Sequence, residues 1–154
     1  MSRFQTQTTS AAALAGNTGF AWINAGAGGG FKLRRCTLGV IAGATTPTSQ
    51  QLVIAIYRTT SAGTTPTAGT INKLDPNSNS PAATVATAFA AAPTLAATPS
   101  WNIPFNTQSG VDLPWELLEE WIVTAGTTNG LAFVNQTNVV PSGHSIVLSY
   151  EWEE

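Results

Sequence analysis

The segment VDLPWELLEEWIV (residues 111–123) holds four of the chain's eight acidic residues, and glycoside hydrolysis requires two carboxylates across one cleft. The spacing of its aliphatic residues also allows a capped helix. The run WIVT favours extended structure, so we expect a turn at 114–118 followed by a strand at 119–124. The adjacent Glu119 and Glu120 then point to opposite faces of that strand. The segment therefore predicts solvated turn and edge charges rather than a catalytic pair.

The other residues with chemical potential form no known motif. His144 is the only histidine, and it lies in a turn-forming PSGH segment whose spacing indicates no Ser-His-Asp arrangement. One histidine and one cysteine cannot make a zinc site, and Cys36 fits a buried structural thiol. The glycine-rich residues 25–31 lack the Gly-Lys-Ser/Thr ending of a phosphate-binding loop. We expect no enzyme activity, no catalytic, cofactor-binding or metal-binding residues, and no small-molecule substrate.

Composition favours a part of a larger assembly. The 154 residues suit one domain, and 9% of them are charged, against about 25% in typical proteins. Such a neutral surface promotes association. No apolar run is long enough for a signal peptide or a membrane span, so we expect a non-exported, soluble chain. The six basic residues are scattered, which argues against a nucleic-acid partner.

Short strand-like segments carry most of the chain. Residues 31–43 and 50–60 are rich in alternating apolar or β-branched residues. The Ala-rich residues 83–106 are interrupted by prolines, which predicts two short strands with a bend. We expect two rows of side chains in the later strands, each on one face of its strand, made of Trp101, Ile103 and Phe105, and of Ile146, Leu148, Tyr150 and Trp152.

With further segments at 19–26, near Trp121 and at 130–137, the tally is about eight strands, and no β-α alternation is present. The predicted fold is all-β: an antiparallel β-sandwich, jelly-roll-like, with an extended N-terminal arm. We place the arm and a Gly-rich hinge at residues 1–30 and the β-sandwich domain at 31–154. The arm's apolar residues are too irregularly spaced for an amphipathic helix, so we expect them to bind a neighbouring subunit: Phe4, Leu14, Phe20 and Trp22.

The charges are distributed unevenly along the chain. All six basic residues precede position 74, and seven of the eight acids follow position 111. Either the N- and C-terminal strands pair and the charges meet across them, or opposite faces dock subunits head to tail. We favour the first interpretation. The acidic C-terminal residues are the alternative candidate for attachment to a partner: Glu151, Glu153 and Glu154.

Several stretches resemble a known family. KLRRCTLGVIAGATTPTSQQLVIAIYRTTSAGTTPTAG, LDPNSNSPAATVATAF, NGLAFVN and, most specifically, FNTQSGVDLPWELLEEWIV and LSYEWEE are similar to small β-sandwich virion proteins of tailed bacteriophages and their prophages. The resemblance covers roughly residues 30–154 and leaves residues 1–29 unmatched.

The resemblance implies a minor virion protein without catalytic residues, most plausibly a capsid decoration (cement) protein that stabilises the head. Its partners would be the major capsid protein and sister subunits. The charge-poor surface, rich in small residues, predicts self-association as a homotrimer, and we expect no membrane and no nucleic acid to bind. The protein would be made in the cytoplasm of the bacterial host and would end on the surface of the phage head. A tail or baseplate sandwich and a host-glycan-binding module are the alternatives.

Overall fold

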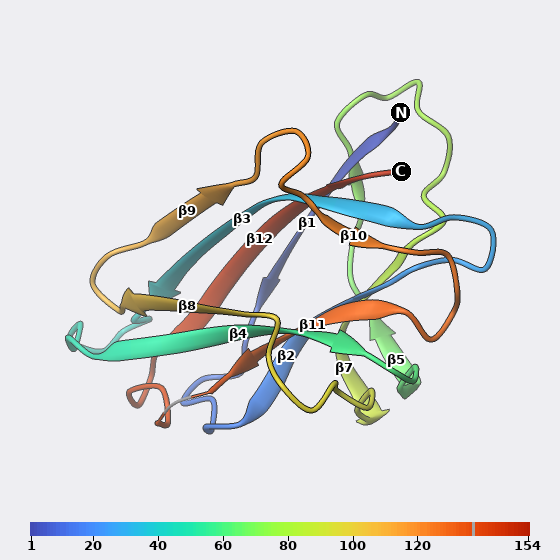
Figure 1. Ribbon diagram of the computed structural model, residues 1–154. Coiled ribbons are helices and arrows are strands. Elements are labelled where there is room, and N and C mark those ends of the chain that lie inside the picture. Colours follow the sequence, from blue (N-terminus) through green and yellow to red (C-terminus); the bar gives the residue numbers. More distant parts are fainter. Residues whose placement is uncertain (137) are drawn as a thin grey trace.

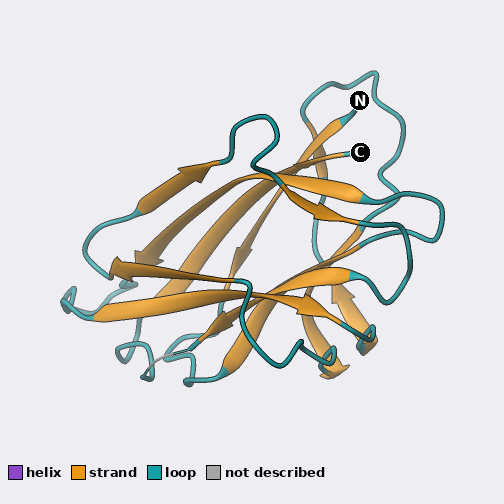
Figure 2. Cartoon of the chain, in the orientation of Figure 1, coloured by secondary structure: helices purple, strands orange, loops and turns teal. Residues whose placement is uncertain are grey.

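The computed structural model describes residues 1–136 and 138–154, and this part of the chain contains strands and loops without a helix (Figure 2). All strand pairs are antiparallel. Twelve strands are described (Figure 1): β1 (Arg3–Thr9), β2 (Thr18–Asn24), β3 (Phe31–Ile41), β4 (Gln51–Thr59), β5 (Thr64–Ala68), β6 (Asn72–Lys73), β7 (Thr84–Ala91), β8 (Trp101–Asn106), β9 (Val111–Pro114), β10 (Trp121–Val123), β11 (Gly130–Asn135) and β12 (Ser145–Glu153).

The strands form two packed sheets. The first has the order β10-β3-β12-β1-β6, and β9 also pairs with β3; the second has the order β5-β7-β2-β11-β4-β8. Four positions in each sheet follow the jelly-roll pattern, with β1, β12, β3 and β9/β10 facing β2, β11, β4 and β8. The jelly-roll sandwich is therefore confirmed. The described strands exceed the expected eight because β9 and β10 share one position and because β5, β6 and β7 are an insertion between β4 and β8.

The prediction of an N-terminal arm is wrong. β1 pairs with β12 along its whole length, from Arg3 opposite Glu153 to Thr9 opposite Val147, and β2 lies inside the second sheet between β7 and β11. Alternate residues of β1 are buried, but two of them are threonines, Thr6 and Thr8. The inward row of β1 is therefore not apolar throughout, and the alternation that identifies a strand was hidden.

The Gly-rich residues 26–30 form a loop between β2 and β3 whose two ends are tightly packed, so they are not a hinge. A Cβ atom added to Gly30 would overlap the carbonyl oxygen of Val123, and one added to Gly26 would overlap that of Ala82. Glycine is required at these two positions because neighbouring backbone approaches too closely for a side chain. The boundary between an arm at 1–30 and a domain at 31–154 therefore disappears, and the described chain is one sandwich.

The core between the sheets contains most of the residues of the two predicted rows. The whole inward row of β12 is buried, from Ile146 to Trp152. Ile103 and Phe105 of β8 are also buried, whereas Trp101 stays 40% exposed at the end of its strand. Cys36 is fully buried, as predicted for a structural thiol, and burial raises its pKa well above the ordinary value.

Candidate functional site

A β-bulge in β3 creates the most unusual polar site of the described chain. In the pairing of β3 with β12, Arg35 lies opposite Glu151 and Leu33 lies opposite Trp152, so Arg34 is an extra residue on β3. A bulge of this kind changes the direction of a side chain without ending the strand. The side chain of Arg34 is only 12% exposed, and it runs across the end of the first sheet.

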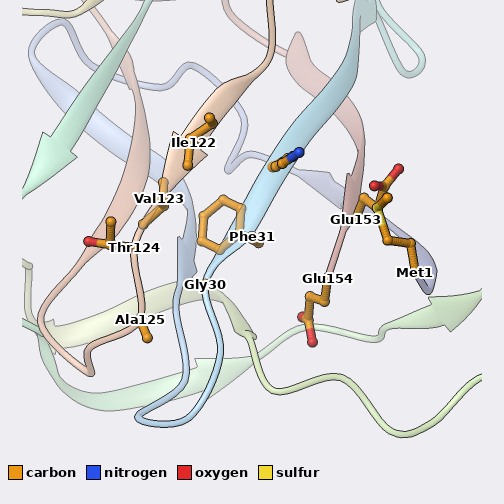
Figure 3. Close-up of a pocket in the computed structure, with 10 residues that line it drawn as sticks. Met1, Gly30, Phe31, Ile122, Val123, Thr124, Ala125, Glu153 and Glu154 are labelled. Atoms are coloured by element: carbon orange, nitrogen blue, oxygen red, sulfur yellow. The ribbon is translucent and has the colours of Figure 1, made fainter. Parts of the chain in front are cut away.

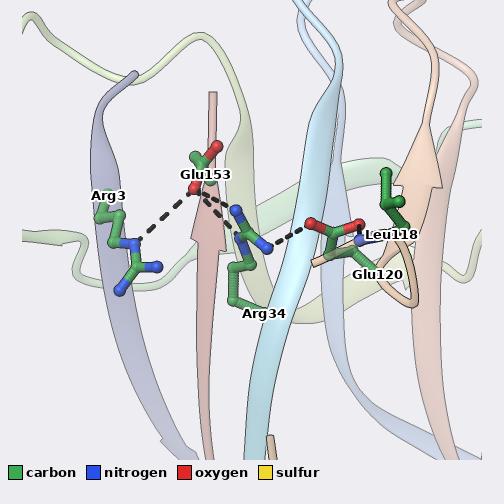
Figure 4. Close-up of polar contacts among 5 residues, drawn as sticks. All are labelled: Arg3, Arg34, Leu118, Glu120 and Glu153. Atoms are coloured by element: carbon green, nitrogen blue, oxygen red, sulfur yellow. Dashed lines mark hydrogen bonds and ion pairs between the residues drawn. The ribbon is translucent and has the colours of Figure 1, made fainter. Parts of the chain in front are cut away.

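Arg34 joins two carboxylates from distant parts of the chain (Figure 4). Its Nε and one terminal nitrogen donate to Oε2 of Glu153 at 3.0 and 2.7 Å, and the other terminal nitrogen donates to Oε1 of Glu120. Arg3 also approaches Oε2 of Glu153, at 3.7 Å. The N- and C-terminal charges therefore meet across paired strands, which confirms the favoured interpretation of the uneven charge distribution.

Glu120 holds the connection between β9 and β10, which we call the leucine loop (residues 116–120). Its Oε2 accepts a hydrogen bond of 2.8 Å from the backbone N–H of Leu118. Although burial opposes ionisation, backbone N–H donors and Arg34 lower the pKa of Glu120 below 4.5. The carboxylate is therefore ionised at neutral pH and holds the loop through its hydrogen bond from the Leu118 N–H.

The leucine loop presents two apolar side chains to solvent. Leu117 is 69% exposed and Leu118 is 90% exposed. Leu118 also has a φ of 77°, a conformation that is unfavourable for a bulky residue and that persists only when its surroundings hold it in place. The turn and the following strand were predicted, but the adjacent strand β9 and this exposed leucine pair were not.

A tryptophan cluster supports the loop. Trp101 lies edge-on to Trp115, with ring centroids 5.6 Å apart, and its centroid is 5.8 Å from that of Trp121. The Arg58 guanidinium lies over the Trp121 ring at 6.0 Å and donates a 2.9 Å hydrogen bond to the carbonyl oxygen of Ile122. These contacts give both ends of the leucine loop a rigid base.

Beside the loop lies an apolar hollow of about 310 Å³, which we call the β3–β10 hollow (Figure 3). Glu153 lines it, and although Oε2 of this carboxylate is fully engaged, Oε1 is buried and has no hydrogen-bond partner in the described chain. Lys32 lies at its edge, opposite Ile122 on β10 and Glu153 on β12. The complete lining is Met1, Gly30, Phe31, Lys32, Ile122, Val123, Thr124, Ala125, Glu153 and Glu154.

The predicted interface residues of the N-terminal segment are not available to a partner. All four are buried, which is a correction of the expected role: Phe4 at 1%, Leu14 at 8% and Phe20 at 3% exposure lie in the main core, and Trp22 at 5% lies in a separate small cluster with Ala132 and Val134. Phe4 packs on Trp152 with centroids 5.7 Å apart, and Trp22 packs edge-on against Phe89 at 4.8 Å. These side chains therefore stabilise this chain's own fold.

The C-terminal acids differ from one another. Glu153 is buried in the Arg34 network. Glu154 accepts hydrogen bonds from the backbone N–H groups of Ala82 and Ala83 and from the Trp152 indole, so it clamps its own chain. Glu151 is half-buried on the outer face of the first sheet, where the pairing places it opposite Arg35. Of the three carboxylates, only that of Glu151 forms no hydrogen bond or ion pair in the described chain.

Asp112 and His144, which were considered for a Ser-His-Asp arrangement, have structural partners instead. Asp112 accepts two hydrogen bonds from Arg35, at 2.8 and 2.5 Å, and these lower its pKa against a smaller effect of burial. His144 is 2% exposed, and its Nε2 accepts the backbone N–H of Thr48 at 3.1 Å. Among residues 1–136 and 138–154, no group of three or more His, Cys, Asp or Glu side chains could hold a metal ion, and no helix is long and apolar enough to cross a membrane.

Comparisons with known proteins returned no relative. No model of a known protein family matches the chain, no curated protein matches it, and no solved structure matches it. What the protein does must therefore be inferred from its own residues, and the leucine loop with the adjacent β3–β10 hollow is the surface that the fold most clearly builds.

Proposed function

We propose that this protein is a non-enzymatic structural protein of a tailed-phage virion, a decoration or cement protein on the head surface. One observation supports this proposal above the others. The leucine loop exposes Leu117 and Leu118 in a fixed conformation, although burying such side chains is worth about 1.5–3 kcal/mol each. An exposed apolar patch held on a rigid scaffold is typical of a protein–protein contact.

The scaffold agrees with that role. A jelly roll supplies a stiff platform, and viral capsid domains are among the proteins that use it, although a fold alone does not define a function. The outer face of the first sheet carries short polar side chains such as Gln5, Thr37 and Ser149. A decoration protein adds buried area at junctions of a shell and thereby stabilises the assembled state by mass action. Its partners in this proposal are the major capsid protein and sister subunits.

The test is to locate the protein on particles. Virions produced with the chain present should carry it at symmetric positions on the head, visible by cryo-electron microscopy and countable by quantitative mass spectrometry. Particles assembled without it should lose their contents at a lower temperature. Absence from purified particles would overturn the proposal, and density on the tail would support the tail or baseplate alternative instead.

A host-glycan-binding module is the second candidate, and the tryptophan cluster is the observation that favours it. Trp101 is 40% exposed beside Trp115 and Trp121, and an aromatic face of this kind can stack on a sugar ring. Saturable binding on a glycan array that Trp101→Ala abolishes would favour this function. Ile41→Ser is the control, because it removes a 53% exposed apolar side chain at the other end of β3.

A further inference from the structure

We infer that the leucine loop of one molecule seats in the β3–β10 hollow of a second copy of this chain. The inference rests on the proposed function, because it names the partner of the same surface. The two features lie close together in the fold: the loop ends at Glu120, and Ile122, two residues later, lines the hollow. Neither feature is covered within the described chain, since Leu118 is 90% exposed and Ile122 is 53% exposed.

The apolar surfaces of the two features match. The loop offers Leu117 and Leu118, and the hollow offers the exposed apolar residues Met1, Ile122 and Ala125. Seating the leucines removes apolar area of both copies from water, which is the main favourable term in association. The loop does not have to change shape on binding, because Glu120 already fixes the Leu118 backbone. Little conformational entropy is then lost when the contact forms.

The charges also match. Glu116 and Glu119 flank the leucines, both are exposed, and neither forms an ion pair in the described chain. Lys32 at the edge of the hollow likewise has no ion pair there. The hollow's own carboxylates are already engaged, Glu153 by Arg34 and Glu154 by backbone N–H groups. A seated loop therefore brings its two carboxylates towards Lys32, whose ammonium group otherwise acts, within the described chain, only on Glu120 from a distance, and this attraction favours the contact and sets its orientation. A basic partner protein is not needed to explain the acidic flanks.

The contact can close in two ways. Because loop and hollow are different surfaces, a head-to-tail arrangement forms a ring, such as the trimer expected from the sequence. Because they are neighbours, a two-fold pair can also make the contact twice, with each loop in the other copy's hollow. The same residues meet in both arrangements, so one cross-linking experiment tests the contact and sedimentation counts the copies.

The experiment uses isolated protein without particles. Chains carrying Leu118→Cys and tagged chains carrying Ile122→Cys are mixed and oxidised; native Cys36 is buried and should not interfere. We expect a disulfide-linked heterodimer as the main mixed product. The matched control replaces Ile122→Cys with Ile41→Cys, since Ile41 is also 53% exposed but lies at the far end of β3. A heterodimer yield no higher than in this control would overturn the inference.

Sedimentation gives a second readout. Wild type should self-associate, and Leu117→Ser or Leu118→Ser should raise the dissociation constant about tenfold or more, as expected when one buried leucine is lost. Ile41→Ser should leave it unchanged. If wild type stays monomeric at high protein concentration, the inference is overturned, but the protein could still decorate particles. If it forms oligomers but is absent from particles, only the proposed function is refuted.

Discussion

Arg34 and Glu120 lie 86 positions apart and form an ion pair, in which a bulged residue of β3 holds the carboxylate that in turn holds the Leu118 backbone. The side chain of Glu120 is 1% exposed and that of Arg34 is 12% exposed. The pair therefore links the end of the first sheet to an exposed loop. This relationship couples the order of the leucine loop to the charge state of one buried glutamate.

Glu120→Gln should release the leucine loop without unfolding the sandwich. The carboxylate of Glu120 accepts from Arg34 with one oxygen and from the Leu118 N–H with the other. Glutamine has a single oxygen, so its NH₂ group would face one of these two donors and that hydrogen bond would be lost. We expect hydrogen exchange of the Leu118 amide to become about tenfold faster, since a hydrogen bond to a charged group is lost. NMR-detected exchange measures this. Glu119→Gln, on the exposed neighbour, is the control, and equal protection in both variants would contradict the role of Glu120.

The stabilising effect of Glu120 should disappear in acid. Because its pKa is lowered in the folded chain, its contribution is fully present above the unfolded value of about 4.5 and is lost as the pH falls through the lower folded value. Urea unfolding of wild type and Glu120→Gln across pH 7 to 2 measures this difference. The two free energies of unfolding should converge towards low pH. A constant difference would show that Glu120 acts through its shape alone.

Leu118→Gly should stabilise the fold while weakening self-association. Glycine relieves the φ of 77°, and the 90% exposed leucine side chain contributes little packing within the monomer. We expect a gain of about 1 kcal/mol in the free energy of unfolding, the lower end of the cost of such backbone strain. Leu117→Gly is the matched control, because no positive φ exists at that position and only the flexibility of glycine is added. Thermal unfolding of both variants separates the effects.

Phe4→Ala should destabilise the protein strongly, because Phe4 is a core residue and not a contact to a neighbouring subunit. It is 1% exposed and packs on Trp152 across β1 and β12. The expected cost is about 3–5 kcal/mol in denaturant unfolding. The adjacent Gln5→Ala, on the outer face of the same strand, should cost far less. Deleting residues 2–24 removes β1 and β2 and should abolish cooperative folding. If the truncated domain still folds, the N-terminal segment is a separate arm after all.

Cys36 should not react with thiol reagents in the native protein. It is fully buried, and its raised pKa keeps the thiol protonated and therefore unreactive. A thiol reagent that releases a coloured product should react with one thiol per chain in denaturant and with almost none in its absence. Fast reaction of the native protein would show that the sandwich opens around β3. It would also mean that Cys36 can form disulfides in the cross-linking experiment and must be replaced there.

The sequence by itself determined the fold class and most of the strands from residue 31 onward, but not β5, β6 and β9. Alternation in β12 predicted which side chains share one face because a strand places successive residues on opposite faces, and this local rule needs no knowledge of the partner strand. The turn before β10 was also predicted, from the local residue preferences. Glu119 and Glu120 were expected in the strand as solvated charges, whereas both precede β10 and Glu120 is buried. The uneven charges also allowed the correct expectation that terminal strands pair.

Only the tertiary structure decided the place of the first 24 residues and the nature of the site. β1 turns Thr6 and Thr8 inward, so its membership in the sheet depends on pairing with β12 rather than on its own pattern. The bulge at Arg34 exists only in the register between β3 and β12. The leucine loop is held by residues far apart in the chain, and no local preference places a leucine at positive φ. These features arise from long-range contacts, which is why the sequence pattern did not reveal them.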